Sequence, residues 1–277
     1  MTARRRDLAR AAGVLAIAQA LAFAAHAAAA SMPKAREGSA APSAAMAAPL
    51  QSTQGAPAAA PPANAAVLLS NERTLTTWAN PVGKVPIRAN PDRSSRTVAR
   101  TRLETEDGFP EVYVLLAQTT DARGRVWERM RIPGRPNGRI GWVPQSALGE
   151  FHVTHWLIEI RLDARRLTAY YDGLRRFSAP VGVGKRSTPT PTGHFWIRER
   201  MKMSSPGNLY WPYALGTSAY SSLTEWPGGG VVGIHGDLGS PQLIPGDPSH
   251  GCVRMHDADI AWLAPRVQLG TPVHIIR

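Results

Sequence analysis

The sequence predicts a mainly β protein with two consecutive β units, and three observations carry this prediction. Short runs of β-branched and aromatic residues, separated by Gly, Pro and Asn turns, occupy residues 78–149 and again residues 150–277. Apolar residues alternate within these runs, and one stretch after residue 256 has helical spacing instead. A hydrophobic content of 43% is sufficient for both units to bury a core.

Residues 1–30 have the pattern of an export signal. Four arginines among residues 4–10 precede an apolar run from Ala11 to Ala30, which ends in small residues. The run also approaches the length that spans a bilayer, so an uncleaved membrane anchor is the alternative. We therefore expect an extracytoplasmic protein, in the periplasm or cell wall, that is secreted or anchored by its N-terminus.

The next segment, residues 31–77, is dominated by Ala, Pro, Ser and Gln and has few large apolar side chains. Because such a composition cannot offset the entropy lost on ordering, we expect a disordered linker. The net charge of the whole chain is +12, and most of it lies outside the leader. In an exported protein this excess suits anionic wall polymers, and no basic stretch interleaved with aromatics points to nucleic acid.

The first β unit, residues 78–149, is expected to be a small barrel. Val112, Val114 and Leu116 alternate with less apolar residues, as half-buried strands do. Residues 85–148 resemble a bacterial SH3-like domain through VPIRANPDRSS, GRVWERMRIPGRPNG and GWVPQSAL. The resemblance implies a module that targets the wall or positions a substrate, and a purely structural spacer is the alternative.

The second β unit contains several short strand-like runs and one helix signal. Asp257 is expected to cap a helix in ADIAWLAPRV, which Pro265 ends or bends. Residues 201–230, rich in Gly, Ser, Trp and Tyr, are expected to form a long functional loop. The expected strands are HWLIEIRL, RLTAYYDG, LRRFSAPVG, GHFWIRER, VVGIH and VHIIR.

The single cysteine, Cys252, lies in the heptapeptide SHGCVRM, residues 249–255. An exported chain with one cysteine forms no internal disulfide, so the thiol is inert and buried, paired between chains, or used in chemistry. The neighbours His250, Gly251 and Arg254 favour chemistry. Cationic groups and backbone N–H groups near a helix start lower the pKa of a thiol and stabilise an oxyanion.

Two histidines compete to be the base for this thiol. His250 is two residues from Cys252 on an extended segment, where the two side chains share a face without meeting in productive geometry. His235 ends the strand VVGIH and is followed by Gly236, so the fold can bring it to the thiol from a neighbouring strand. We therefore expect His235 to be the base.

Three motifs occur in order in the second unit. A TPTG turn enters a strand in TPTPTGHFWI (residues 188–197), IHG spans residues 234–236, and SHGCVRM spans residues 249–255. Through these motifs, residues 153–277 resemble the YkuD-type L,D-transpeptidase catalytic domain. The resemblance implies a β-sandwich with one short helix after the nucleophile, and a reaction that needs no cofactor and no metal.

The resemblance also implies the roles of individual residues. Cys252 is the nucleophile that accepts the acyl group, and His235 is the general base and acid. A carbonyl near Gly236 orients the imidazole of His235. The residues that shape the nucleophile loop and the oxyanion pocket are Ser249, His250 and Gly251.

Substrate-binding roles follow from the same resemblance. Arg254 is expected to bind a peptide carboxylate, and a surface ion pair with Asp257 or Asp259 is the alternative. Aromatic residues of the long segment either line a peptide groove or only attach the segment to the sheet. These residues are Tyr210, Trp211, Tyr213 and Trp226.

The implied reaction is the cross-linking of peptidoglycan stem peptides. The Cys252 thiolate attacks a stem tetrapeptide and releases D-alanine, and an amine of another stem then takes the acyl group. Carbapenem-type β-lactams are expected to acylate the same sulfur. If water takes the acyl group instead, the protein is an L,D-carboxypeptidase or endopeptidase.

Three further classes of protein are disfavoured. In papain-like wall endopeptidases the cysteine precedes the histidine, whereas here His235 precedes Cys252. A zinc peptidase using His235, Asp237, His250 and Cys252 lacks a recognised ligand spacing. A non-catalytic wall-binding protein would not need both the cysteine and the histidine.

Overall fold

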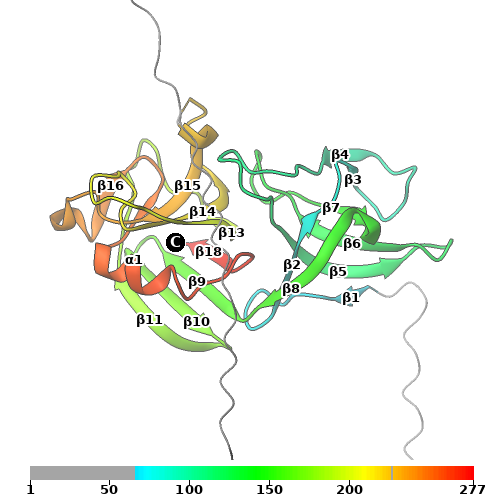
Figure 1. The fold of residues 1–277 in the computed structure, drawn as a ribbon, viewed down its shortest axis with the longest axis horizontal. Helices are drawn as coiled ribbons and strands as arrows, with labels where there is room; N and C mark the ends of the chain where they lie inside the picture. The colour runs from blue at the N-terminus through cyan, green and yellow to red at the C-terminus, as the bar shows by residue number, and fades with distance from the viewer. Residues whose placement is uncertain (1–65, 226) are drawn as a thin grey trace, which may run out of the picture. The chain divides into compact units, whose positions relative to one another are not determined.

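The computed structural model describes residues 66–225 and 227–277, which form two β-sheets (Figure 1). The prediction of a mainly β chain with one short helix is confirmed for this part, whose single α-helix is α1 (Asp257–Leu263). None of the helices in the described ranges is long and apolar enough to cross a membrane. The expected export segment and the linker up to residue 65 lie outside the described residues, as does Trp226.

The first sheet has eight strands in the order β4-β3-β7-β6-β5-β2-β8, with β1 paired to β5. Ile87, Tyr113, Leu115, Met130 and Val143 are fully or almost fully buried in its core. The resemblance of this unit to an SH3-like domain stays a prediction. The strands are β1 (Val67–Leu68), β2 (Thr76–Pro81), β3 (Pro86–Arg88), β4 (Thr97–Arg100), β5 (Tyr113–Thr120), β6 (Val126–Arg131), β7 (Ile140–Pro144) and β8 (Leu148–Thr154).

The first unit begins earlier than residue 78, where the linker was expected to end. Strand β1 and the start of β2 lie within residues 66–77. Thr77 is buried, pairs with both Leu115 and Val153, and donates its hydroxyl proton to the carbonyl of Leu69 (2.7 Å). This part of the segment is ordered because its backbone completes the sheet, although its composition resembles that of the linker.

The second sheet has ten strands in the order β11-β10-β9-β18-β13-β14-β15-β17-β12-β16. Strand β13 joins its two halves, because residues 193–196 pair with β18 and residues 197–202 pair with β14. The strands are β9 (Trp156–Arg161), β10 (Arg166–Tyr171), β11 (Leu174–Pro180), β12 (Gly182–Gly184), β13 (Gly193–Lys202), β14 (Tyr213–Tyr220), β15 (Val231–His235), β16 (Gly246–Ser249), β17 (Val253–Arg254) and β18 (Pro272–Ile276).

One core cluster joins both halves of this sheet and the helix. Ile158 and Leu167 come from one half, Leu215 and Ile234 from the other, and Leu263 from α1, drawn in orange-red in Figure 1. Apolar burial of this extent is the main force that holds a β domain together. It also sets the place of β15, which ends at His235, and of β17, which begins directly after Cys252.

The expectation of a long loop over residues 201–230 is wrong in its middle. Strand β14 (Tyr213–Tyr220) lies there between β13 and β15, and every residue from Ala214 to Tyr220 is buried. The strand escapes pattern recognition because it is covered on both faces, so its apolar and polar residues do not alternate. Small residues such as Gly216 replace the large β-branched ones that usually indicate a strand.

The helix begins and ends almost where the sequence predicts. Its N-cap is His256 and not Asp257, and no side chain caps it. The Asp257 carboxylate instead accepts a hydrogen bond from the backbone N–H of Asp237 (3.1 Å), which follows β15. The helix ends at Leu263, two residues before Pro265, since proline cannot continue the hydrogen-bond ladder.

Candidate active site

The fold brings Cys252 and His235 to adjacent strands. Strands β15 and β17 are parallel neighbours, with Ile234 paired to Val253 and His235 paired to Arg254. Cys252 directly precedes β17, and its Sγ accepts a hydrogen bond from the backbone N–H of Gly233 at 3.4 Å.

Two cavities meet at this cysteine, one of about 130 Å³ and one of about 80 Å³, and Cys252 and His235 line both. The sulfur is therefore not sealed in apolar packing. Space for a reacting group exists on two sides of it.

His235 is held as a neutral base. Its Nδ1 lies 2.8 Å from the carbonyl oxygen of Gly236, which can only accept, so Nδ1 carries the proton and Nε2 is unprotonated. Burial lowers the pKa of His235 to about 4; the Gly236 carbonyl opposes this shift and the charge of Arg254 adds to it. At neutral pH the imidazole can therefore take a proton at Nε2.

Gly236 has a steric reason to be glycine. A Cβ at this position would lie 1.8 Å from the carbonyl oxygen of Trp211 and 2.4 Å from Oδ1 of Asp257. A side chain would push the Gly236 backbone away from its neighbours and displace the carbonyl that orients His235. Gly236 is thus placed to position the imidazole, as the sequence motif predicts.

The pKa of the Cys252 thiol differs from expectation. Burial raises it above its ordinary value, and the Gly233 N–H and the charge of Arg254 only partly oppose that effect. Arg254 lowers this pKa as predicted, but the expectation of a lowered thiol pKa overall is wrong because burial outweighs the charge. The resting site holds a neutral thiol beside a neutral imidazole, so a thiolate has to form by proton transfer within the pair.

The loop before the cysteine is shaped by hydrogen bonds. Ser249 Oγ donates to the carbonyl oxygen of Cys252 and accepts from the backbone N–H of Gly251 (3.1 Å). Gly251 has a φ of 128°, a value that side-chain-bearing residues rarely adopt. His250 Nε2 lies 3.0 Å from Nζ of Lys185, a residue that the sequence did not single out.

Of the three described aromatic residues predicted to line the groove, Tyr210 alone lies at these two cavities. Its ring packs edge-on against His235, with 5.1 Å between the ring centroids, and burial raises the pKa of its hydroxyl. Trp211 lines a different cavity, beside Asn208, and Tyr213 packs against the apolar core. The sequence groups these aromatic residues, but the turn before β14 points them in different directions.

Arg254 lines the smaller cavity together with Ser249 and His250. Its Nε is buried without a hydrogen-bond partner, and the ion pairs of the described chain include none with Asp257 or Asp259. Burial lowers the pKa of Arg254, while Cys252 raises it. The side chain is thus a partly buried cation that lines the same cavity as the sulfur and whose Nε lacks a hydrogen-bond partner, an arrangement suited to a carboxylate.

Two acidic residues that sequence reasoning missed line the larger cavity. Glu199 lies on β13, and Asp107 lies on a turn of the first β unit. Neither is near Cys252 in sequence or belongs to a recognisable motif, so no local signal could have indicated them.

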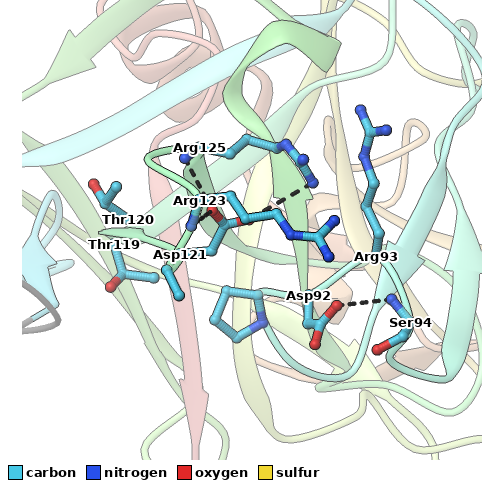
Figure 2. Close-up of a pocket in the computed structure, with 10 residues that line it drawn as sticks. Asp92, Arg93, Ser94, Thr119, Thr120, Asp121, Arg123 and Arg125 are labelled. Carbon is cyan, nitrogen blue, oxygen red and sulfur yellow. Dashed lines mark hydrogen bonds and ion pairs between the residues drawn. The ribbon is translucent and has the colours of Figure 1, made fainter.

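A larger cavity, of about 520 Å³, lies on the first β unit and has different chemistry (Figure 2). Three arginines line it, at positions 93, 123 and 125. Its two carboxylates are already engaged: Asp92 accepts from the backbone N–H of Ser94, and Asp121 accepts from the backbone N–H groups of Arg123 and Arg125. Neither Cys252 nor His235 lines this cavity, so it is separate from the candidate active site.

The described ranges contain no metal-binding cluster of three or more His, Cys, Asp or Glu side chains. The set proposed for zinc, which includes His235, Asp237 and Cys252, is therefore not assembled there. Asp237 instead accepts from the backbone N–H of Gly239 (2.9 Å).

Comparison with known proteins supports the reading of the motifs. Residues 155–275 match the family model of the L,D-transpeptidase catalytic domain, YkuD. The YkuD protein of Bacillus subtilis strain 168 is 35% identical over 120 residues, and that of Bacillus licheniformis is 35% identical over 118 residues. Each match covers 43% of this chain, and the chain spans 65% and 64% of the two relatives.

Two solved structures are also similar to this chain. An L,D-transpeptidase from Mycobacterium smegmatis is 18% identical with a TM-score of 0.36, over 55% of this chain and 91% of its own. The catalytic domain of an E. faecium L,D-transpeptidase acylated by ertapenem is 25% identical with a TM-score of 0.35, over 45% of this chain and 99% of its own. Residues 155–275 are thus similar in sequence to the YkuD-type L,D-transpeptidase catalytic domain.

Proposed function

We propose that this protein is a cysteine-dependent L,D-transpeptidase that cross-links peptidoglycan stem peptides. The observation that carries the proposal is the pair of Cys252 and His235, which line the same two cavities and have complementary protonation states. A protonated thiol beside an unprotonated Nε2 is the resting arrangement that a general base needs to activate a nucleophile.

In the first half of the reaction, His235 Nε2 takes the thiol proton as Sγ attacks the carbonyl that follows the L-centre of a stem tetrapeptide. The C–S bond forms, the bond to the terminal D-alanine breaks, and His235 returns the proton to the leaving amine. The backbone N–H of Cys252, in the loop shaped by Ser249 and Gly251, is the donor we assign to the oxyanion. Arg254 binds the carboxylate of the terminal D-alanine.

In the second half, an amine of another stem attacks the thioester and the thiol is regenerated. Water is the competing acceptor, and hydrolysis makes the protein an L,D-carboxypeptidase or endopeptidase. A carbapenem-type β-lactam reacts by the same first step, because its strained amide carbonyl accepts the sulfur.

Mass spectrometry of the intact protein after incubation with stem tetrapeptide or a carbapenem tests this proposal. We expect a covalent adduct on the wild type, no adduct on Cys252→Ala, and dimeric peptide products with the wild type alone. Free tripeptide without dimers would move the assignment to a hydrolase. An adduct that persists in Cys252→Ala would overturn it.

For the first β unit we propose an SH3-like module that holds the enzyme on the wall. The cavity with three arginines is the surface suited to anionic wall polymers. Co-sedimentation with purified walls should weaken in Arg93→Glu/Arg123→Glu. The matched control is Arg175→Glu/Arg176→Glu, which makes the same charge change on exposed residues of β11. If both variants lose wall binding equally, the net charge of the protein and not this cavity determines the binding.

We further propose that residues 1–30 direct export to the periplasm or cell wall. Deletion of these residues should retain the protein in the cytoplasmic fraction of an expressing cell. A cleaved signal leaves a mature chain that lacks the segment, whereas an anchor leaves it attached in the membrane fraction, and mass spectrometry separates the two. Export of the deleted form would contradict the proposal.

A further inference from the structure

The larger cavity beside Cys252 has an acidic side formed by two different β units. Glu199, on β13, is 3% exposed, and its Oε2 is buried without a hydrogen-bond partner. Asp107 is exposed, on the turn between Thr105 and Phe109, and lines the same cavity. The cavity thus has one carboxyl in its wall and another at its mouth.

A side-chain hydrogen bond joins Glu199 to Asp107, and the charge of Arg198 acts on Glu199 without forming an ion pair with it. Arg198 and Arg102 are engaged with two other carboxylates, Glu106 and Glu111, at 2.6 to 3.0 Å. Two cations and two anions balance in that network. Among the residues that the structure describes, no ion pair involves Glu199 or Asp107.

The same network holds the Asp107 turn in place. Arg198 binds Glu106, which directly precedes Asp107, at 3.0 Å, and Arg102 binds Glu106 from the other side at 2.6 Å. Within the turn, the backbone N–H of Phe109 donates to Oγ1 of Thr105 at 3.1 Å. The first β unit therefore contributes a positioned side chain to the cavity that contains the predicted nucleophile.

The rest of the cavity suits a short alkyl chain. Met201, Ala214 and Val231 provide apolar surface, and Tyr210 and Cys252 lie along the same lining. A Cβ at Gly216 would lie 2.4 Å from Glu199 Oε2, so glycine leaves the space in which this carboxyl sits. An ammonium on a short apolar stem matches a lining of this kind.

The two cavities at the sulfur have opposite charge. Arg254 lines the smaller one, and Glu199 and Asp107 line the larger one, while Tyr210 and His235 are common to both. A transfer reaction needs a donor and an acceptor on the same sulfur. The basic side suits the donor's carboxylate, which leaves the acidic side for an amine.

We infer that Glu199 and Asp107 form the subsite for the primary ammonium group of the acyl acceptor. This inference rests on the proposed function and assigns the acceptor class: an amine on an alkyl chain, as in the side chain of a diamino acid. The ammonium gives one proton to the carboxyl pair, and the neutral amine attacks the thioester. The C–N bond forms, the C–S bond breaks, and the second amine proton passes through His235 to the sulfur.

Binding can be measured without any turnover. Titration of Cys252→Ser with Nα-acetyl-lysine amide, followed by NMR, should show saturable shifts, whereas the neutral isostere Nα-acetyl-norleucine amide should bind at least about tenfold more weakly. Asp107→Asn should remove that preference. Equal binding of the two amides to the parent protein would overturn the inference whatever the enzyme does.

Turnover gives the second test. With the acyl-enzyme formed, Asp107→Asn and Glu199→Gln should transfer to Nα-acetyl-lysine amide about tenfold or more slowly than the wild type. Transfer to hydroxylamine, which is small and neutral at pH 7, should not change. Glu104→Gln is the matched control, because Glu104 is an exposed acid of the same loop that does not line the cavity.

The outcomes separate the inference from the function on which it rests. If no adduct forms on the wild type, the proposed function fails while the binding test still stands. If adducts form but both Asp107→Asn and Glu199→Gln transfer to the lysine amide like the wild type, the ammonium subsite is wrong. A parallel loss with hydroxylamine would also overturn it, because that loss would indicate a damaged site rather than a lost subsite.

Discussion

Two polar clusters with buried members differ in the charge of their side chains at neutral pH: one is ionised and the other is neutral. In the ion cluster, formed by Arg102, Glu106, Glu111 and Arg198, burial pushes the pKa of Glu106 upward, but the charge of Arg198 and the other partners lower it to about 2. In the nucleophile pair, burial instead lowers the pKa of His235 to about 4 and raises that of Cys252.

The difference teaches that burial alone does not decide ionisation. Loss of water penalises the charged form in both clusters, and opposite charges at hydrogen-bond distance reverse that penalty in only one of them. Arg198 is 1% exposed and Glu111 is completely buried, yet they bind each other at 2.6 Å. The ion cluster links the two β units through charged groups. The Cys252–His235 pair is neutral at rest, and in the proposed reaction it becomes charged.

The largest expected effect concerns the nucleophile pair. His235→Gln removes the group to which we assign the thiol proton and keeps a polar side chain of similar length. Adduct formation with a carbapenem should slow by about 10²- to 10⁴-fold, the range typical for a lost general base. Timed mass spectra of the intact protein measure the rate, and a rate within a factor of three of the wild type would contradict the assignment.

The next effect concerns the ion cluster. Arg198→Met leaves Glu106 and Glu111 without their main cation and should lower the free energy of unfolding by about 3–5 kcal/mol, as breaking a buried ion pair does. Chemical denaturation measures this loss. The double variant Arg198→Met/Glu111→Gln should recover part of it, because one unpaired charge is then removed, and a further loss would contradict the pairing.

A smaller effect concerns pH. Because the pKa of His235 is lowered to about 4, its imidazole stays neutral and able to accept a proton well below the ordinary histidine range. The rate of adduct formation should therefore fall on the acid side near pH 4 rather than near pH 6.5. Measuring the rate of adduct formation from pH 3.5 to 8 tests this. A rate that already falls near pH 6.5 would show that burial does not lower the pKa of His235.

The smallest effect is expected at an exposed ion pair. Arg165 binds Asp247 at 2.8 Å with both side chains about half exposed. Since water and salt screen such a pair, Arg165→Gln should leave the thermal midpoint unchanged within error. A loss of stability as large as that expected for Arg198→Met would contradict the view that exposed ion pairs stabilise the fold less than buried ones.

The placing of Cys252 and His235 at one site was predictable because their signals are local. Cys252 lies in a short motif, and the sequence favours His235 over His250 as the base because His235 ends a strand. The structure places His235 in register beside Arg254 and places His250 Nε2 against Lys185. Neighbouring strands in a parallel sheet bring their ends together, so this pairing follows from the order of motifs.

Other parts were not predictable in the same way. Strand β14 carries no alternating pattern, so the sequence predicts a loop where the strand lies. Trp211 and Tyr213 belong to the same aromatic run as Tyr210. Nothing in the sequence indicates that Tyr210, rather than the other two, packs on His235. Asp107 and Glu199 belong to different β units, and only the packing of those units brings them to one cavity.

Properties set by near neighbours could be read from the chain alone: mainly β structure from alternation, a helix stopped by Pro265, and a cysteine and histidine with the motif order of acyl transfer. The direction of the Cys252 pKa shift, the exposure of Glu199 and the charge of each cavity depend on which distant segments cover the site. Desolvation and Coulomb interactions act through space rather than along the sequence, and they become definite when the chain has folded.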